Sequence, residues 1–519
     1  MHISRKTRAR HPNRGLPAAF VDTSRFTYQV PDDATSPRQI PLIHQTPIVR
    51  FPPGSVKDPA TNALFSTLDN GNTEVVFTRV WLNPRAIIGN ITLDHGNSGY
   101  TAFELPAMRN PATADGSFTY PEGDLAEVNT VSSLDAGLTF EENDPVTKGE
   151  VKPWSVETWN RGWLENNRKF VDQQGEWYLD DVGAQLALFY KPRKDPNRPN
   201  DQLQNENVYS TTNPLRFQIP VTFTLVSVEG VSGVPAKNGQ PARDEQPVSG
   251  FRIIGKWTCN LRSGNNACVI DEAKASKVHS ADFGLKFRYS AWQYENGRID
   301  EKRDPVTEEI IEAKRNHDFY SFGLHAAGLN GMIDGMYVND LKIIGCELSR
   351  YGESAVVLGG NRSRNLGGMD SGNYYGQPRG HVTNVLLQCN FIDDAGGGGI
   401  RIDDYPKSQR DSRGFRQLPT APVAGPDNNV IDRTAIYRIG DCFADTSGIY
   451  VSHGFNTIVS TNHVGPAPSH SILVGAKCAR SHLEAVVVRN NTVVRSVQRL
   501  LDMGAIYTHG MQNLSLIHI

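Results

Sequence analysis

Two aspartates occupy equivalent places beside a repeated β run near the end of the chain. Asp445 lies just before a Gly-Ile-Tyr run, and Asp502 lies just before a similar Gly-Ala-Ile-Tyr run. Acid–base cleavage of a glycosidic bond requires two carboxyl groups, one protonated and one ionised. We therefore take Asp445 and Asp502 as the first candidate catalytic pair.

Further polar residues border the same kind of run. Asp403 and Asp404 follow the equivalent run one repeat earlier, and with His453 they are reserve catalytic candidates. A simpler, structural interpretation exists for each residue: the aspartates would cap turns, and the histidine would be a polar residue at a corner. Substrate binding on this face is expected from Arg401, Tyr450, Tyr507 and His509.

Arg401 also supports a different chemistry. Together with Lys407 it would suit a lyase, in which a basic group removes the proton α to a uronate carboxylate and calcium neutralises the acid. Calcium would be a cofactor only in that case. Otherwise no cofactor is expected, and no spacing of cysteines and histidines predicts a metal site.

The elements that would position these side chains are five repeated units in the C-terminal half. Each unit has two strand-length apolar runs, a polar bend and a glycine corner, which is the signature of a solenoid. The first runs of the units lie at residues 341–348, 384–392, 430–436, 458–464 and 487–493. The pattern predicts an all-β fold, a right-handed parallel β-helix of the pectate-lyase-like type, with coils about 4.8 Å apart.

Aligning the units predicts the register of the coils. Cys346 is expected to stack on Cys389, and Leu348 on Phe391. The bend after the first strand needs a residue that tolerates a left-handed backbone and can hydrogen-bond the backbone of its neighbours. The residues at that place form an expected structural ladder: Asn390, Asn462 and Asn491. Residues 361–383 and 405–428 are too long for corner turns and are expected on the binding face.

The N-terminal half has a different sequence pattern. Strand runs such as 74–81 and 86–93 are separated by polar turns without helical periodicity, which predicts a β-sandwich or barrel-like module. Between residues 154 and 177 the chain is rich in tryptophan beside carboxylates and amides, a composition that suits sugar rings. Trp163 and Trp177 are therefore candidate substrate-binding residues, although packing at a domain junction explains either one equally well.

Four of these segments together resemble a known family. They are residues 163–167, 175–180, the two coils containing Cys346 and Cys389, and residues 501–508. The chain resembles secreted bacterial right-handed β-helix proteins classed as glycoside hydrolase family 141. The resemblance implies a catalytic carboxylate at Asp502. In that family the last motif reads Asp-Gly-Gly-Ala-Ile-Tyr, whereas Met503 replaces its first glycine here.

Both ends of the chain resemble cut interior segments. Residues 1–39 are expected to be the remnant of an upstream β-helix, 40–150 the β-rich module, 151–199 a Trp-rich junction and 200–513 the β-helix. Residues 514–519 are expected to be a non-native tail. A lost export signal would make the natural location extracellular or periplasmic.

Bulk composition excludes several classes of function. A net charge of −3 argues against nucleic-acid binding, and no apolar run is long enough to span a membrane. Cys259 and Cys268 flank a polar loop and would bridge it in an oxidising compartment, although idle thiols are the plainer interpretation.

Three functional classes therefore remain for an expected monomer whose partner is a polysaccharide or oligosaccharide. A glycoside hydrolase using a carboxylate pair is favoured; a polysaccharide lyase and a non-catalytic glycan-binding adhesin are the alternatives. Sugar, linkage and stereochemical outcome depend on loop shapes that the sequence leaves open.

Overall fold

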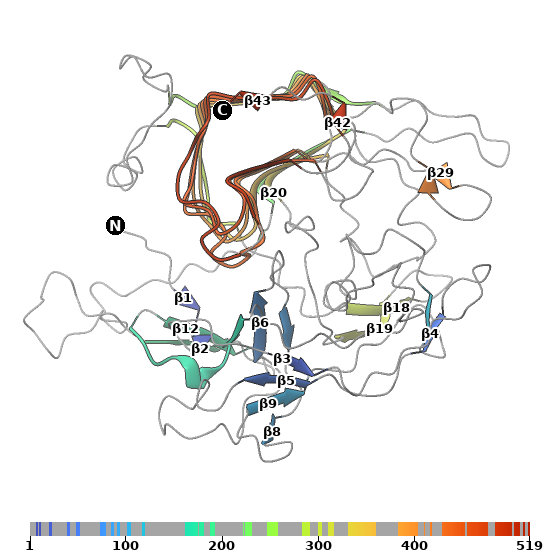
Figure 1. The fold of residues 1–519 in the computed structure, drawn as a ribbon, viewed down its shortest axis with the longest axis vertical. Helices are drawn as coiled ribbons and strands as arrows, with labels where there is room; N and C mark the ends of the chain where they lie inside the picture. Colours follow the sequence, from blue (N-terminus) through green and yellow to red (C-terminus); the bar gives the residue numbers. More distant parts are fainter. Residues whose placement is uncertain are drawn as a thin grey trace, which may run out of the picture. The chain divides into compact units, whose positions relative to one another are not determined.

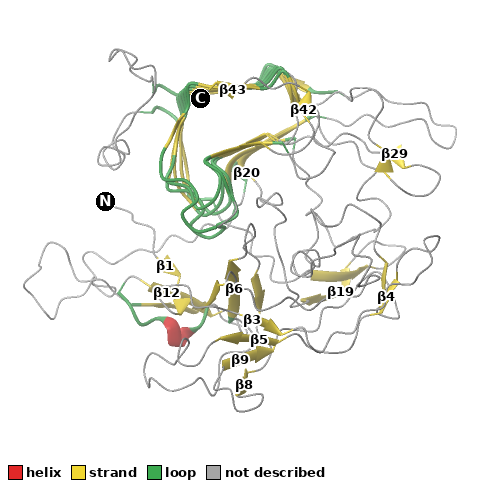
Figure 2. Cartoon of the chain, in the orientation of Figure 1, coloured by secondary structure: helices red, strands yellow, loops and turns green. Residues whose placement is uncertain are grey.

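The computed structural model confirms a nearly all-β chain that contains a parallel β-helix. It describes in full residues 73–76, 162–174, 176–178, 188–191, 222, 224–230, 246–257, 283–290, 331–359, 382–402, 428–451, 454–475, 485–500 and 503–508, and elsewhere only the backbones of the strands given below. Within these residues, helical structure is limited to the 3-10 turn η2 (Arg168–Phe170), as Figure 2 shows. No described helix has the length and hydropathy to cross a membrane.

Contacts divide the chain into two compact units, of which the second contains the β-helix. This unit comprises Glu122–Val128, Pro220–Tyr294 and Phe322–Ile519. Its three long sheets are entirely parallel, and Figure 1 views the stacked coils so that they nearly superimpose. The β-helix also includes an upstream strand, β16 (Arg252–Ile254), which pairs in parallel with β22 (Lys342–Ile344).

The strands of each sheet follow in order. The first sheet is β14 (Val226–Glu229), β20 (Gly331–Met336), β24 (Ser354–Leu358), β28 (Ile400–Ile402), β33 (Ile449–Val451), β37 (Ile472–Val474) and β41 (Ile506–Thr508). The second sheet is β16 (Arg252–Ile254), β22 (Lys342–Ile344), β26 (Leu386–Gln388), β31 (Val430–Asp432), β35 (Ile458–Ser460), β39 (Val487–Arg489) and β43 (Ile517–His518). The third sheet is β17 (Lys286–Arg288), β23 (Glu347–Tyr351), β27 (Phe391–Ala395), β32 (Ala435–Tyr437), β36 (His463–Val464) and β40 (Thr492–Val493).

Shorter strands complete the unit. Two three-stranded parallel sheets lie at β15 (Val248–Ser249), β21 (Val338–Asn339) and β25 (Val382–Thr383), and at β34 (Gly454–Phe455), β38 (Leu483–Glu484) and β42 (Gln512–Asn513). An antiparallel pair is formed by β29 (Gln409–Arg410) and β30 (Arg416–Gln417).

Apolar residues repeated from coil to coil form the interior of the β-helix. In the second sheet the central residue of each strand faces inward, and the buried members stack in register: Ile253, Ile343, Leu387, Ile431, Val459 and Val488. A single coil cannot bury these side chains by itself, so the apolar core exists only because coils stack. Alternate residues of each strand point outward and are available for polar chemistry.

The predicted stacking of Cys346 on Cys389 is wrong by one residue. Ile344 pairs with Gln388 and Leu348 pairs with Ile392, so Cys346 faces Asn390 rather than Cys389. The Asn390 side chain sets this register, because its Oδ1 accepts a hydrogen bond from the Cys346 N–H at 3.0 Å. Matching cysteine to cysteine aligns two residues of the same type whose backbones occupy different places in the bend.

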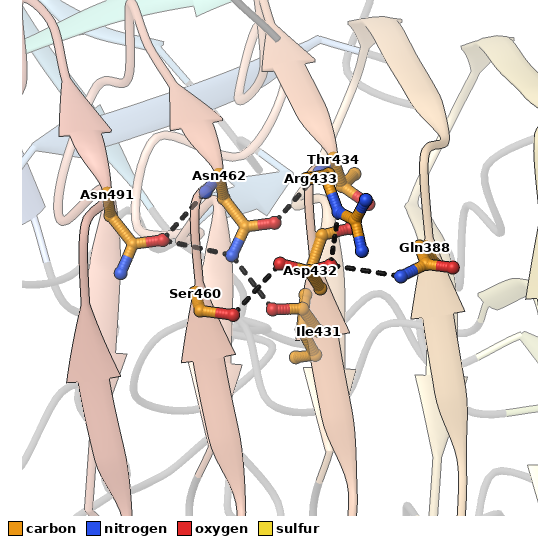
Figure 3. A network of polar contacts seen from close by, with 8 residues as sticks. All are labelled: Gln388, Ile431, Asp432, Arg433, Thr434, Ser460, Asn462 and Asn491. Carbon is orange, nitrogen blue, oxygen red and sulfur yellow. Dashed lines mark hydrogen bonds and ion pairs between the residues drawn. The ribbon is translucent and has the colours of Figure 1, made fainter. Parts of the chain in front are cut away.

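The asparagine ladder is confirmed by its hydrogen bonds (Figure 3). Asn462 Oδ1 accepts from the Thr434 N–H at 2.9 Å, and its Nδ2 donates to the Ile431 carbonyl and to Asn491 Oδ1, both at 3.0 Å. Asn491 Nδ2 in turn donates to the Val459 carbonyl at 2.9 Å. Each side-chain amide therefore satisfies backbone groups of the preceding coil.

The left-handed residues of the bend are not the asparagines themselves. They precede the ladder position by one residue: Gly345 (φ 66), Cys389 (φ 52), Arg433 (φ 50), Thr461 (φ 57) and Asn490 (φ 54). The sharp turn and the hydrogen-bonding amide are thus supplied by successive residues, so the turn position tolerates many residue types.

Replacing Asn462 with alanine is expected to lower the free energy of unfolding by about 2 kcal/mol, because buried backbone groups lose their partners. Urea titration followed by circular dichroism measures this change. Gln498→Ala removes an exposed amide and serves as the control, with an expected loss below about 0.5 kcal/mol. Equal losses in the two variants would contradict a stabilising role for the ladder.

The first unit comprises Met1–Pro121, Asn129–Ile219 and Glu295–Ser321. One antiparallel sheet contains β2 (Arg10–His11), β11 (Arg161–Glu165), β6 (Glu74–Thr78) and β7 (Arg85–Ile87). Another contains β3 (Phe20–Asp22), β5 (Ile48–Phe51), β9 (Thr101–Glu104) and β8 (Ile91–Leu93). The smaller groups are β1 (Thr7–Arg8), β12 (Glu176–Asp180) and β13 (Ala187–Tyr190); β10 (Ser117–Thr119) with β4 (Gln39–Pro41); and β18 (Ile299–Arg303) with β19 (Ile310–Arg315).

These sheets refine the expectation of a sandwich or barrel. The described strands form open sheets, and none of these sheets closes into a barrel. The predicted run 86–93 is divided between two sheets, because β7 pairs with β6 whereas β8 pairs with β9. The sequence between the two strands includes Gly89 and Asn90, both of which favour turns.

Candidate functional site

The outer face of the first sheet collects three residues that the sequence proposed for substrate binding. The inward-facing isoleucines of β28, β33, β37 and β41 belong to the core, so the middle residue of each strand faces outward. In register these outward residues are Asp334, Val357, Arg401, Tyr450, Leu473 and Tyr507. Arg401, Tyr450 and Tyr507 therefore share one row that runs along the axis of the β-helix.

Arg401 and Tyr450 are in direct contact. The guanidinium carbon lies 5.6 Å from the centre of the tyrosine ring, a cation–π geometry. Arg401 is 7% exposed and Tyr450 is 5% exposed, so the pair is held in place by its surroundings. Tyr507, which is half-buried, is the more accessible member of the row.

Asp445 lies in the tight turn that leads into β33 and is 2% exposed. Thr446 closes this turn, since its N–H and its Oγ1 both donate to the Phe443 carbonyl, at 3.3 and 2.8 Å. Neighbouring coils hold the turn from both sides: the Gly399 N–H donates to the Ser447 carbonyl at 3.1 Å, and Ser469 Oγ donates to the Thr446 carbonyl at 2.6 Å. The backbone around Asp445 is therefore rigid.

The remaining candidates of this face lie outside the described residues. They are Asp502, Asp403, Asp404, His453 and His509. Their positions in the sequence relative to the strands follow from the strand bounds. Asp403 follows the last residue of β28 directly, and His509 follows the last residue of β41. Asp445 and Asp502 precede strands that are two coils apart, because β37 lies between β33 and β41.

His470 is a polar residue of this face that the sequence interpretation missed. It is 1% exposed and lies two residues before β37. Its ring centre is 4.7 Å from that of Tyr507, at an interplanar angle of 32°. The available signal was the run Ser469-His470-Ser471, which stands before an apolar strand as Thr446-Ser447-Gly448 does one coil earlier.

The two tryptophans assigned to substrate binding belong to the first unit. Trp163 on β11 is 3% exposed, and its Nε1–H donates to the Glu165 carboxylate, so it is a core residue of that unit. Trp177 on β12 is half-buried and pairs with Tyr190 on β13. Near it, burial raises the pKa of Glu176 to about 7, although backbone N–H groups of Gln173 and Asp172 hydrogen-bond its carboxylate and act in the opposite direction.

A second polar group, also missed, covers the outer face of the third sheet. Glu347 and Asp393 are fully buried there, and each forms an ion pair, with Arg288 and Arg438 respectively. Tyr437 stacks on His463 with ring centres 5.1 Å apart. Because the carboxylates are buried and paired, this group has the character of a structural network.

His463 gives that network a dependence on pH. Burial lowers its pKa below the ordinary value of 6.5, and its Nδ1 has no hydrogen-bond partner among the described residues. Below about pH 6.5 the His463 imidazole is protonated in the unfolded chain but stays neutral in the native state. The free energy of unfolding therefore falls as pH decreases, until the lowered native pKa is reached. We expect the urea midpoint to fall between about pH 7.5 and pH 5.5, and to fall less in His463→Phe. An identical dependence in both proteins would assign the effect to other groups.

The described residues contain no group of three or more His, Cys, Asp or Glu side chains arranged to hold a metal ion. Cys346 and Cys389 are free thiols, and Cys259 and Cys268 lie outside the described residues.

No protein-family model matches the sequence, and no curated protein matches it either. A solved structure named "Glycoside hydrolase" matches with a TM-score of 0.50 and 13% sequence identity. The match covers 98% of this chain and 65% of the other, so this chain spans about 65% of that structure's length. At this identity the likeness supports the shared fold.

Proposed function

We propose that this chain is a carbohydrate-active β-helix protein, and that it is a glycoside hydrolase acting on a complex polysaccharide. The observation that carries the proposal is the row of Arg401, Tyr450 and Tyr507 on the outer face of the first sheet, beside the turn that holds Asp445. Aromatic rings stack on sugars, and a guanidinium donates to hydroxyl or carboxylate oxygens. The name of the structural neighbour agrees with this class of substrate.

In the proposed reaction one of Asp445 and Asp502 is the general acid and the other is the general base. One carboxylic acid protonates the glycosidic oxygen as the bond to the sugar carbon breaks, and the other carboxylate removes a proton from the attacking water. Equivalent backbone positions two coils apart are separated by about 9.6 Å. This backbone separation is nearer to the carboxyl spacing of inverting enzymes, about 6.5 to 9.5 Å, than to that of retaining enzymes, about 5 to 5.5 Å, so we expect inversion.

The protein is proposed to act outside the cytoplasm, where polysaccharides are found. The alternative is a lyase, in which Arg401 would be the basic group. A lyase would require a uronate substrate and a cation. The two reactions differ in their products, since hydrolysis creates a reducing end without a double bond and elimination creates an unsaturated uronate.

A panel of plant and bacterial polysaccharides distinguishes the classes. New reducing ends without ultraviolet absorbance support the hydrolase. Reducing ends with matching absorbance at the wavelength of unsaturated uronates overturn it in favour of the lyase. Binding measured by calorimetry without any product indicates a non-catalytic glycan-binding protein, and the absence of both binding and product removes the carbohydrate proposal.

A further inference from the structure

We propose that His470 is a positioning residue of the site on the first sheet. Its imidazole fixes the backbone of Gly504, in the segment that leads from Asp502 to Tyr507. The inference rests on the proposed function, because it assigns His470 a role in placing a candidate catalytic carboxylate. Neither His470 nor Gly504 contacts substrate in this assignment.

The contact between His470 and Gly504 involves one ring nitrogen and both backbone groups. Nδ1 lies 3.1 Å from the Gly504 nitrogen and 3.0 Å from its carbonyl oxygen. With the ring proton on Nε2, Nδ1 accepts a hydrogen bond from the Gly504 N–H; with the proton on Nδ1, the ring donates to the Gly504 carbonyl. Each neutral tautomer therefore holds the same residue, which lies two positions after Asp502 in the sequence.

The same contact helps to set the position of the Tyr507 ring. The tyrosine ring packs 4.7 Å from the imidazole. It also lies against Gly504, where an added Cβ would meet Tyr507 Cδ2 at 3.1 Å and the Ile506 carbonyl at 3.2 Å. Because glycine leaves just enough room for the ring, a movement of the Gly504 backbone would displace Tyr507 from its row.

The segment carrying His470 also supports the turn of Asp445 from the other side. The Gly448 N–H donates to the His470 carbonyl at 3.2 Å, and Ser469 Oγ donates to the Thr446 carbonyl at 2.6 Å. β37 lies between β33 and β41, the strands that Asp445 and Asp502 precede in the sequence. The coil that contains His470 therefore contacts both the turn of Asp445 and Gly504, two positions after Asp502.

Two substitutions separate positioning from simple packing. In His470→Asn the side-chain amide takes the place of Nδ1 and retains a partner for Gly504, whereas in His470→Gln the amide lies farther out, near the place of Nε2. We expect kcat of His470→Asn to stay within about 3-fold of the wild type. We expect kcat of His470→Gln to fall about 10- to 100-fold with KM nearly unchanged, since a small misplacement of a reacting group costs up to about 10²-fold.

Hydrogen exchange of the peptide around Gly504 provides a readout that does not depend on activity. Exchange should accelerate in His470→Gln and remain slow in His470→Asn, because the Gly504 N–H keeps an acceptor in the second variant. The control is His463→Gln, which replaces another buried histidine, on the third sheet, and should leave kcat at the wild-type level.

Several results would overturn the assignment. Equal exchange at Gly504 in all variants removes the backbone contact, and equal kcat in His470→Asn and His470→Gln removes the distinction that positioning requires. A rise in KM at constant kcat makes His470 a binding residue, and a matching fall in His463→Gln assigns the loss to general destabilisation. If the wild-type chain cleaves no glycan, the proposed function fails and His470 has no reacting group to position, while exchange still decides the contact with Gly504.

Discussion

Replacing Asp502 with asparagine is expected to lower kcat by about 10²- to 10⁴-fold while glycan binding persists. The amide preserves the shape of the carboxyl group but neither donates the acidic proton nor carries the negative charge. Asp445→Asn should cause a loss of similar size, because the two aspartates precede, in the sequence, strands of the same sheet that are two coils apart. The measurements are turnover of the cleaved polysaccharide and calorimetric binding of the same ligand.

The double variant and a matched aspartate sharpen this experiment. Groups that act as a unit are not additive, so Asp445→Asn combined with Asp502→Asn should be little worse than the more damaging single change. Asp441 lies in the same coil as Asp445 but is exposed near Arg499, and Asp441→Asn should retain wild-type turnover. Wild-type activity in Asp502→Asn would end its assignment as a catalytic group. Full activity in Asp445→Asn alone would transfer the partner role to another carboxylate.

Replacing Arg288 with leucine is expected to reduce the free energy of unfolding by about 3 kcal/mol. Arg288 Nε and a terminal guanidinium nitrogen reach the two oxygens of Glu347 at 2.6 and 2.5 Å, and Ser349 Oγ donates to the same carboxylate at 2.7 Å. Glu347 is fully buried, so removing Arg288 leaves a carboxylate that has lost its paired cation. The expected loss is at the lower end for a broken buried pair, since the arginine side chain is 24% exposed.

Another arginine of the same coil supplies the control. Arg252 pairs with Asp340 on the next coil, but both side chains are exposed, so Arg252→Leu should cost less than about 1 kcal/mol. Adding Glu347→Gln to Arg288→Leu should recover part of the loss, because the buried charge is then removed. Equal unfolding midpoints for Arg288→Leu and Arg252→Leu would show that burial does not strengthen the first pair.

The sequence predicted the core of the β-helix better than its outer faces. The repeat of apolar residues predicted the β-helix, and the shared place of Asn390, Asn462 and Asn491 predicted their ladder, because both are local patterns repeated in each coil. The register failed at Cys346 and Cys389, where identical residue types are offset by one position in the bend. Local similarity does not specify which backbone group a side chain will satisfy on the next coil.

The outer faces required knowledge of contacts that are distant in the sequence. Arg401, Tyr450 and Tyr507 were predicted to share a face because they occupy equivalent places in repeated runs. The importance of His470 was not visible, since its partner Gly504 is a backbone position 34 residues away. Likewise, the ion pair of Arg288 with Glu347 joins residues separated by 59 positions, and only the completed fold brings them together.

The asparagine ladder also has a consequence for how such a chain can change over generations. Its described hydrogen bonds join the bends of successive coils, and the long segment 405–428 lies elsewhere in the sequence, between β28 and β31. Lengthening a flexible segment adds a closure cost that grows slowly with its length. Substrate choice, which such segments would shape, is therefore free to drift by insertion and deletion while each coil remains held to the next.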